Sequence, residues 1–513
     1  MAPQLRQDTP VPAPPTQSDV QTKPVRRIKK ICCVGAGYVG GPTSAVMAVK
    51  NPEVQVTVVD YDAQRISAWK SDDLPIYEPG LLSMVQRARD GSDERMPNLF
   101  FSTDVDRSIA EAELILLSVN TPTKTLGQGA GHASELCYLE SAVRKIGEVA
   151  TSNKIIVEKS TVPCRAAETL RDVLRATSAP GVEFEILSNP EFLAEGTALQ
   201  NLLHPDRVLI GSLDTPQGLE AARALAQIYG SWVATDRIIT INLYSSELAK
   251  LAANALLAQR ISSVNALSAM CESVGADIDE VSLAVGLDKR IGSRMLKASV
   301  GFGGSCFRKD ILSLAYIAES LHLFEVADYW RSVVRINEYQ KDRFTTRIVR
   351  SLYNSLSNKT LAILGFAYKK DTGDTRETAA VSVINNLLSE GAHLRVYDPL
   401  VKEPQILAEM AHSNTHPQEI LDRIIICPSA KDACTGADAV VILTEWDEFS
   451  NIKARKDLAQ VTDVEAGKQK VCWQQIAQVM RRPMHVFDGR NVVDAKPLEA
   501  LGFRVESIGK RRG

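Results

Sequence analysis

The residues with the clearest capacity for chemistry are a cysteine and the glycines before it, in the segment Gly301-Phe302-Gly303-Gly304-Ser305-Cys306. The following segment, Asp310–Ala318, has apolar residues at helical spacing, which places Cys306 just before a helix or within its first turn. Free backbone N–H groups and the helix dipole at that position favour a thiolate, and Arg308 and Lys309 add positive charge. Cys306 is therefore either a nucleophile or a buried structural cysteine beside a helix cap.

A second set of residues has the GxGxxG spacing, in Gly35-Ala36-Gly37-Tyr38-Val39-Gly40. A predicted strand, Ile31–Val34, precedes this motif, and a predicted helix, Thr43–Lys50, follows it. The next predicted strand, Val54–Val59, ends at Asp60, twenty residues after the last glycine. This succession of strand, turn, helix, strand and acid is typical of a dinucleotide-binding fold.

Each glycine of this motif has a physical reason in such a fold. Gly35 permits the tight turn, Gly37 lets a pyrophosphate approach the helix N-terminus, and Gly40 allows close packing of helix and strand. Asp60 can accept hydrogen bonds from an adenosine ribose, which favours NAD over NADP because the acid repels a 2′-phosphate. Arg65 slightly weakens that preference. We expect an NAD site, the alternative being a glycine turn that binds nothing.

Three further predicted strands end in polar loops. The continuous apolar run Leu114–Val119 is suited to a strand buried on both faces of a parallel sheet, and the loop 120–123 follows it. Strands at Lys154–Val157 and Phe184–Leu187 lead into the polar segments 158–163 and 188–196. Open α/β sheets bind ligands at the carboxyl edge of their strands, so these loops are expected to line one site.

The segment from Ser245 to about Ala284 has almost no Gly or Pro and predicts one long helix or two joined helices. Within it Ser246, Lys250 and Asn254 recur every four residues, which makes them one polar stripe on an otherwise apolar helix. The stripe either faces a buried partner or faces solvent.

The last third repeats the pattern of the first. Strands are predicted at Thr360–Leu364 and His393–Tyr397, a helix at Ala379–Glu390, and a later strand from Ala439. This second βαβ sheet lacks the later two glycines of the motif. Three cations follow its predicted strands, which indicates a nucleotide site built from positive charge: Lys369, Arg376 and Arg490.

Taken together, eight segments closely resemble the UDP-glucose 6-dehydrogenases of the UDP-glucose/GDP-mannose dehydrogenase family. They are GAGYVGGPT (35–43), SVNTPTKT (118–125), EKSTVP (158–163), SNPEFLAEGTA (188–198), SSELAKLAANA (245–255), ASVGFGGSCFRKD (298–310), GFAYKKDTGDTRE (365–377) and FDGRN (487–491). The similarity runs from about Ile28 to Lys510. It implies oxidation of the C6 hydroxymethyl group of UDP-glucose to a carboxylate, with two NAD⁺ reduced and no metal.

The expected chemistry suits the residues. Oxidation of an alcohol to an acid passes through an aldehyde, and a cysteine can hold that aldehyde as a thiohemiacetal until a second hydride leaves to give a thioester. The resemblance implies that Cys306 supplies the sulfur and that Lys250 and Asp310, the latter through an ordered water, assist deprotonation and stabilise the oxyanion. It further implies that Asn254 orients the reacting oxygen. Glu191 would be the base for thioester hydrolysis, with Thr161 helping to hold the water.

The resemblance also implies two sets of binding residues. The NAD set is Gly35, Gly37, Tyr38, Val39, Gly40, Asp60, Arg65, Val119, Asn120, Thr121, Pro122, Thr123, Thr161, Glu195 and Arg376. The UDP-sugar set is Glu191, Phe192, Leu193, Lys250, Asn254, Lys297, Val300, Gly301, Phe302, Gly303, Tyr368, Lys369 and Arg490. Arg290 resembles an arginine that reaches the substrate of a neighbouring subunit.

Composition limits the classes of protein that fit. With 513 residues, 45% hydrophobic and 24% charged, and a net charge of −3, the chain has no signature of a nucleic-acid binder. Nine scattered cysteines without CxxC spacing suit reduced thiols in the cytoplasm. No apolar run approaches a membrane span, and the N-terminus lacks the apolar core of a signal peptide.

We therefore expect a two-sheet α/β protein with four parts. These are a disordered Pro-rich arm (1–27), an NAD-binding Rossmann domain (28–240), a central helical and dimerisation domain (241–357), and a UDP-sugar-binding Rossmann-like domain (358–513). A homodimer or homohexamer is expected. The alternatives are the same chemistry on GDP-mannose or UDP-N-acetylmannosamine, a two-electron β-hydroxyacid dehydrogenase, and a non-catalytic nucleotide sensor.

Overall fold

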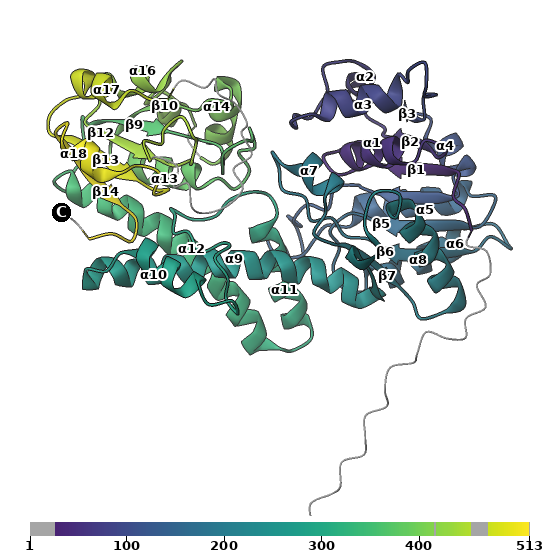
Figure 1. Cartoon of the computed structure of the whole chain (residues 1–513). Coiled ribbons are helices and arrows are strands. Elements are labelled where there is room, and N and C mark those ends of the chain that lie inside the picture. Colours follow the sequence, from purple (N-terminus) through teal and green to yellow (C-terminus); the bar gives the residue numbers. More distant parts are fainter. Residues whose placement is uncertain (1–25, 415–416, 453–469, 512–513) are drawn as a thin grey trace, which may run out of the picture.

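The computed structural model describes residues 26–414, 417–452 and 470–511. The predicted arm, residues 1–27, lies almost wholly outside this described part. Two α/β lobes stand side by side over a layer of helices that connects them (Figure 1).

The first lobe is built on an eight-stranded sheet with the order β3-β2-β1-β4-β5-β6-β7-β8. Its strands are β1 (Lys30–Val34), β2 (Gln55–Val59), β3 (Leu99–Ser102), β4 (Leu114–Leu117), β5 (Lys154–Glu158), β6 (Phe184–Ser188), β7 (Val208–Ser212) and β8 (Ile238–Asn242). Neighbouring strands are parallel except at β6 and β7, which pair antiparallel. The strand order reverses between β1 and β4, and this switch point is where doubly wound sheets bind nucleotides.

Helices cover both faces of the first sheet. They are α1 (Gly40–Lys50), α2 (Ala63–Lys70), α3 (Leu81–Arg89), α4 (Val105–Glu111), α5 (Cys137–Val149), α6 (Ala166–Thr177), α7 (Ala198–Leu203) and α8 (Pro216–Tyr229), with a short 3-10 helix at Thr235–Arg237. Strand β4 shows why its sequence is apolar throughout. Leu114 and Leu116 belong to the core on one face, whereas Ile115 and Leu117 belong to the core on the other.

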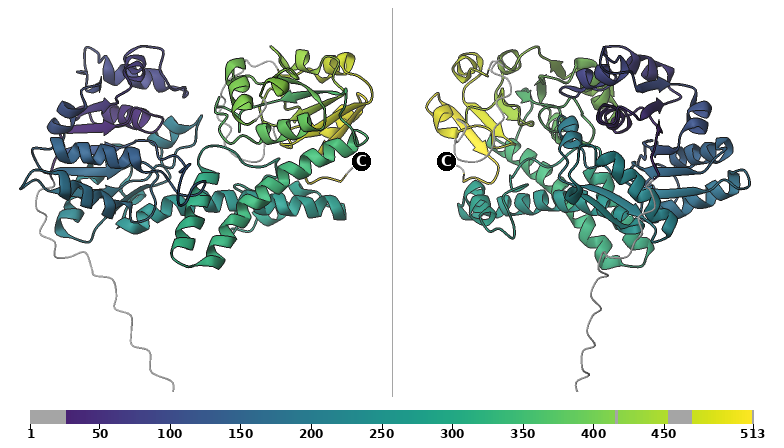
Figure 2. Two further views of the ribbon diagram at one scale, coloured as in Figure 1. Left: turned by 180° about the vertical axis from the view of Figure 1, so that it is seen from behind. Right: turned by 45° about the vertical axis from the view of Figure 1, so that its right-hand side comes forward.

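The central layer consists of α9 (Leu243–Val274), α10 (Ile278–Gly286), α11 (Phe307–Ser320) and α12 (Phe324–Ser351). The predicted run 245–284 is thus two helices. Helix α9 ends at Gly275, which has a φ of +81°, and the Asp277 side chain caps α10 by accepting from Asp279 N–H. Helices α9, α11 and α12 pack on one another and are seen from two further sides in Figure 2.

The second lobe holds a six-stranded parallel sheet with the order β11-β10-β9-β12-β13-β14. Its strands are β9 (Thr360–Leu364), β10 (His393–Tyr397), β11 (Ile424–Ile426), β12 (Ala439–Ile442), β13 (Met484–Asp488) and β14 (Phe503–Ser507). Its helices are α13 (Ala379–Ser389), α14 (Glu403–His412), α15 (Pro417–Leu421), α16 (Ala430–Cys434), α17 (Trp473–Val479) and α18 (Ala495–Glu499). The predicted fold class, two Rossmann-like α/β sheets joined by a long central helix, is confirmed. No helix in the described ranges is long and apolar enough to cross a membrane.

Candidate active site

A cleft of about 1520 Å³ is lined by residues of both lobes and of the central helices. Most of the residues predicted to bind or react lie on its wall. From the first lobe these are Gly37, Tyr38, Val39, Val119, Asn120, Thr121, Pro122, Thr123, Thr161, Glu191, Phe192, Leu193 and Glu195. From the central part they are Lys250, Asn254, Lys297, Gly301, Phe302, Gly303 and Cys306, and from the second lobe Tyr368, Lys369, Arg376 and Arg490.

Cys306 is the exposed residue at the N-cap of α11, as its sequence context predicts. The preceding turn needs its glycines for two reasons. Gly304 has a φ of +87°, and a Cβ there would lie 2.9 Å from the Tyr368 ring. A Cβ on Gly303 would lie 2.5 Å from the Glu377 carbonyl oxygen. The turn is therefore pressed against the second lobe, and it presents the thiol to the cleft.

The polar stripe of α9 faces inward, which decides the question that its sequence left open. Ser246, Lys250 and Asn254 are all buried. The Asn254 Nδ2 donates to Asp310 Oδ2 at 2.6 Å, and Asp310 is only 1% exposed. Burial raises the pKa of Asp310, although the charges of Lys309 and Lys250 and the Asn254 hydrogen bond oppose the rise. The stripe thus brings the Asn254 amide and the Lys250 ammonium of α9 toward the buried Asp310 carboxyl group, which lies one turn after Cys306 on α11.

Glu191 is held by a cation that the sequence interpretation did not single out. Its Oε2 lies 3.3 Å from Lys159 Nζ, and its Oε1 accepts from Phe192 N–H at 2.5 Å. Lys159 is itself buried and donates to Asn189 Oδ1 and to the Tyr229 hydroxyl. Burial disfavours the charge of Lys159, but Tyr229 and Glu191 outweigh it and raise the pKa of Lys159. The Lys159 ammonium and the Phe192 N–H therefore hold the Glu191 carboxylate in a fixed orientation.

The Phe192 ring joins the predicted base to the predicted catalytic lysine. Arg207 stacks on this ring with its Cζ 4.0 Å from the centroid, and Lys250 Nζ lies 5.2 Å from the same centroid. Cation–π contacts of this kind favour one orientation of the ring and of both cations. Phe192 thus orients the Lys250 ammonium within the cleft.

The glycine motif offers room for a dinucleotide. A Cβ on Gly37 would meet no atom within 4 Å, whereas on Gly40 it would lie 2.0 Å from the Gly35 carbonyl oxygen. Gly37 therefore borders open space at the start of α1, where free N–H groups suit a pyrophosphate. Asp60 Oδ2 accepts from Ala36 N–H at 2.9 Å and from Arg65 at 3.3 Å. The acid supports the turn of the motif, so the residues present fit the dinucleotide that the sequence predicts.

The polar loop after β4 is tied to the helix that carries the thiol. Lys309 Nζ donates to the Thr121 carbonyl oxygen at 3.0 Å. The Thr121 hydroxyl in turn donates to the Thr161 carbonyl oxygen at 2.8 Å. Lys309 therefore fixes α11 against the first lobe. Its sequence position predicts a different role, in which its positive charge favours the Cys306 thiolate.

The second lobe closes the cleft with cations at its strand ends. Arg490 donates through Nε to the Leu443 carbonyl oxygen and through Nη2 to that of Tyr368. Arg376 pairs with Glu195, which belongs to the first lobe, at 2.9 Å. Burial and the neighbouring Asp374 carboxylate raise the pKa of Glu195 to about 7. The three predicted cations, Lys369, Arg376 and Arg490, therefore line the cleft, and two of them contact the opposite lobe.

Seven predicted residues lie off the lining of the cleft. Asp310 lies behind Asn254, and Val300 donates its N–H to the Gly489 carbonyl oxygen. Arg290 is far from burial, with its side chain 88% exposed and paired with Asp288. The others are Gly35, Gly40, Asp60 and Arg65, which support the turn of the glycine motif. Arg290 therefore has no place in the cleft of its own chain.

Sequence reasoning did not identify several residues that shape the cleft. Lys159 and Asn189 stand in segments that it quoted, directly after predicted strands, and their position at the sheet edge was an available signal. Tyr229 at the end of α8 and Arg207 before β7 carry no local signal, because their partners Asn189 and Phe192 lie 40 and 15 residues away in the sequence.

Comparisons with known proteins agree with this arrangement. Three models of the UDP-glucose/GDP-mannose dehydrogenase family match: the NAD binding domain over residues 29–233, the central domain over 244–339 and the UDP binding domain over 362–495. UDP-glucose 6-dehydrogenase of Drosophila melanogaster is 53% identical over 484 residues, or 94% of this chain and 96% of that protein. UDP-glucose 6-dehydrogenase 4 of Oryza sativa subsp. japonica is 53% identical over 491 residues, or 94% and 97%. A solved UDP-glucose dehydrogenase from Pyrobaculum islandicum superposes with a TM-score of 0.75 at 27% identity, covering 96% of this chain and 99% of that one.

Proposed function

The chain belongs to the UDP-glucose/GDP-mannose dehydrogenase family, and we propose that it oxidises UDP-glucose at C6 to UDP-glucuronate with two NAD⁺. The observation that carries the proposal is the convergence of Cys306, the Lys250–Asn254–Asp310 group and Glu191 on one cleft between two nucleotide-binding lobes. A two-electron alcohol dehydrogenase does not require a cysteine in this position. A four-electron oxidation requires one to hold the aldehyde between the two hydride transfers.

The first oxidation removes a hydride from C6 and a proton from its hydroxyl group. NAD⁺, when bound, would supply the hydride acceptor for each of the two oxidations. Lys250 is positioned by the Phe192 ring and, with Asp310, assists removal of the proton and stabilises the developing oxyanion. Asn254 is held by Asp310 through its amide nitrogen, so its carbonyl oxygen is left to orient the reacting hydroxyl.

The Cys306 sulfur then adds to the aldehyde carbon, forming a C–S bond, and the carbonyl oxygen gains a proton to give a thiohemiacetal. Loss of a second hydride and of that proton leaves a thioester. Glu191 removes a proton from water as the water attacks the thioester carbon. The C–S bond breaks, the thiol is restored and the carboxylate is released. Lys159 and the Phe192 N–H hold the Glu191 carboxylate in place for this step.

Both nucleotides have residues to hold them. The Gly37 region at the start of α1, the loop Val119–Thr123 and the Glu195–Arg376 pair would hold NAD. Tyr368, Lys369 and Arg490 of the second lobe, with Lys297 and the turn 301–303, would hold the UDP-sugar. Guanidinium and ammonium groups at strand ends suit a diphosphate.

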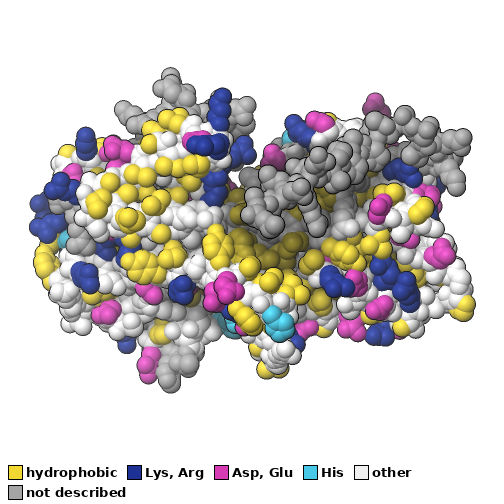
Figure 3. Space-filling view, turned by 90° about the horizontal axis from the view of Figure 1, so that it is seen from below, with side chains coloured by type: hydrophobic (Ala, Val, Ile, Leu, Met, Phe, Trp, Pro, Cys, Tyr) yellow, Lys and Arg dark blue, Asp and Glu magenta, His cyan; other side chains and the backbone are white. Residues whose placement is uncertain are grey.

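We also propose a homo-oligomer in the cytoplasm. Figure 3 looks onto the underside of the molecule, where hydrophobic side chains gather across the middle of the face. Several large apolar residues of α9 are exposed, among them Leu267, Met270 and Val274, which supports burial against another subunit. The exposed Arg290 could then reach the cleft of that subunit. All nine cysteines are free, which supports a reducing compartment.

Incubation of the purified protein with NAD⁺ and one sugar nucleotide at a time tests the proposed reaction. UDP-glucose should yield two NADH per molecule consumed. A higher rate with GDP-mannose or UDP-N-acetylmannosamine would assign a different substrate. One NADH per molecule would indicate a two-electron dehydrogenase, and binding without turnover would indicate a nucleotide sensor.

A further inference from the structure

Glu78 is a buried carboxylate in the loop between α2 and α3, and no predicted function accounts for it. It is 5% exposed. Its Oε1 accepts from Gly196 N–H at 2.5 Å and its Oε2 accepts from Ala198 N–H at 3.0 Å. Both oxygens are therefore used by a single turn that lies 118 residues further along the chain.

The same turn is also supported by apolar packing. Leu199 and Leu202 of α7 form a small core cluster with Val46 of α1, and Leu193 packs against this cluster. A Cβ on Gly80, two residues after Glu78, would lie 3.3 Å from a methyl carbon of Leu199. The loop of Glu78 thus lies directly against the segment that begins with the predicted base Glu191.

The second lobe contacts the opposite side of this turn. Lys369 Nζ donates to the Glu195 carbonyl oxygen at 2.7 Å, and Arg376 pairs with the Glu195 carboxylate. A Cβ on Gly196 would lie 2.4 Å from the Asp371 carbonyl oxygen. Residues 194–198 are therefore enclosed between Glu78 on one side and the second lobe on the other.

We propose that Glu78 is a positioning residue for thioester hydrolysis, because it fixes the turn on which the second lobe docks and from which Glu191 extends. This inference rests on the proposed function. If the turn shifts, the position of Glu191 relative to the second lobe changes. Misplacement of a base by about 1 Å can slow a step by as much as roughly a hundredfold.

The substitution Glu78→Gln tests this. Glutamine retains one accepting oxygen, but its NH₂ group then faces the second backbone N–H, so one hydrogen bond is lost and two donors oppose each other. Glu113→Gln is a control for the same chemical change at another site. The Glu113 carboxylate also accepts two backbone N–H groups, those of Lys29 and Lys30, both through Oε2, and it lies just before β4, away from the cleft.

Two measurements are made on the full-length enzyme. After mixing with UDP-glucose and NAD⁺ and removal of free substrate, intact mass spectrometry follows the decay of the covalent adduct on Cys306. Hydrogen–deuterium exchange follows the amides of residues 190–200. We expect Glu78→Gln to slow adduct decay by roughly tenfold to a hundredfold and to speed exchange in this segment, with Glu113→Gln unchanged in both.

Each outcome has a definite meaning. Adduct decay and exchange in Glu78→Gln equal to those of the unsubstituted enzyme would overturn the inference while leaving the proposed function intact. Equal slowing of decay in the Glu113→Gln control would also overturn it, since the effect would then be general destabilisation. If no adduct or NADH forms in the unsubstituted enzyme, the proposed function fails and the inference with it. If Glu78→Gln does not fold, Glu78→Asp serves, because its shorter side chain cannot bridge both amides.

Discussion

Replacing the buried Asp310 by asparagine should change the turnover and the stability of the protein in opposite directions. Asp310 Oδ2 accepts from Asn254, whereas its Oδ1 has no partner among the described residues. An asparagine of the same shape can keep the bond to Asn254 through its carbonyl oxygen. It cannot hold a negative charge or move a proton.

The substitution should raise the stability of the protein and lower its turnover. Burial raises the pKa of Asp310, so the folded protein disfavours the ionised carboxylate. A buried group without a partner costs about 1–3 kcal/mol, and more when it is charged. Removing the charge should therefore raise the melting temperature by roughly 2–4 °C for each kcal/mol recovered. Turnover should fall by about 10²–10⁴-fold, the usual contribution of a general acid or base.

The gain in stability should depend on pH in a defined direction. Because the pKa of Asp310 is higher in the folded protein, the unfolded chain releases its proton first as pH rises from about 4. The original protein then loses stability relative to the variant, and the difference grows until the folded carboxyl group ionises as well. Below pH 4 both carry a neutral side chain, so the difference should vanish.

Scanning calorimetry between pH 4 and 8, with NADH formation from UDP-glucose at 340 nm (about the absorption maximum of NADH), measures both quantities. Asn254→Asp, which places a second acid beside Asp310, is a useful comparison because it should lower stability at neutral pH. A variant Asp310→Asn that melts several degrees lower than the original, or that keeps full turnover, would refute the reasoning.

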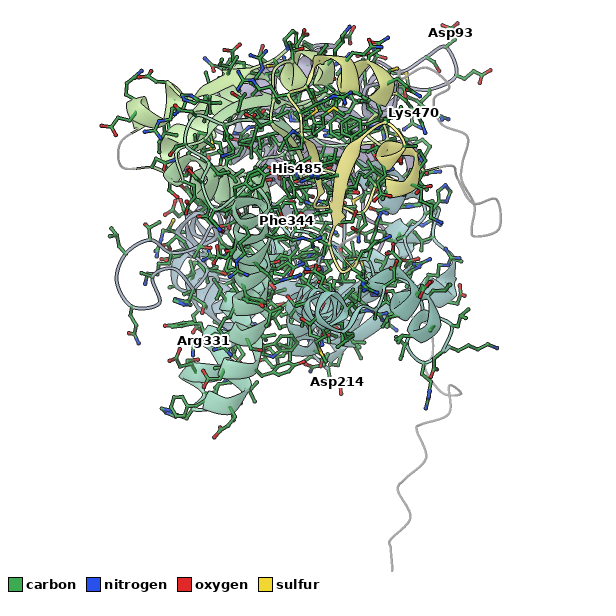
Figure 4. All side chains as sticks on the ribbon, turned by 90° about the vertical axis from the view of Figure 1, so that its left-hand side faces the viewer. Asp93, Asp214, Arg331, Phe344, Lys470 and His485 are labelled. Atoms are coloured by element: carbon green, nitrogen blue, oxygen red, sulfur yellow. The ribbon has the colours of Figure 1, made fainter. Side chains whose placement is uncertain are left out.

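Three further outcomes are expected. Cys306→Ser should abolish formation of the acid and leave at most one NADH per sugar; normal UDP-glucuronate production would contradict the covalent route. Glu191→Gln should accumulate the thioester, seen as an adduct by intact mass, and full turnover without an adduct would remove Glu191 from its role. His485, labelled in Figure 4, is buried in β13, and burial lowers its pKa, so stability should be lost as pH falls below about 6.5. His485→Phe should flatten that loss, measured by melting temperature against pH, and an unchanged slope would exclude this histidine as its source.

Much of the fold could be predicted because its signals are local. The apolar run Leu114–Val119 predicted a strand buried on both faces, and residues Leu114–Leu117 form one. The position of Cys306 at a helix start also followed from neighbouring residues alone. Such features depend on spacing within a few turns of chain, which a single sequence displays.

Features that depend on distant partners could not be predicted. Asp60 and Asp398 both follow the second strand of a βαβ unit, yet Asp398 Oδ2 accepts from Phe366 N–H, Ala367 N–H and the Trp446 indole, so it holds together the segments that follow β9 and β12. The sequence of α9 could not decide whether Lys250 faced solvent, because Phe192 and Asp310 reach it only in the folded chain. Lys159 lies in the motif at 158–163, but its role could not be predicted because it depends on a contact with Tyr229, 70 residues away.

The passage from β8 into α9 limits how this protein can be divided. Strand β8 ends at Asn242 and α9 begins at Leu243, with the Asn242 side chain capping the helix, so no linker separates the sheet from the helix. The N-terminal part of α9 carries Lys250 and Asn254, both buried, and α9 packs against β6, β7 and β8 of the first lobe and against α11. The first lobe is therefore not a transferable module. A chimaera that exchanges cofactor-binding lobes between relatives should carry the chain through α11 with the first lobe, because α9 carries Lys250 and Asn254 while Cys306 and Asp310 lie at the start of α11. A junction at the obvious boundary near residue 242 would separate Glu191 from these residues and divide the reacting residues between two parents.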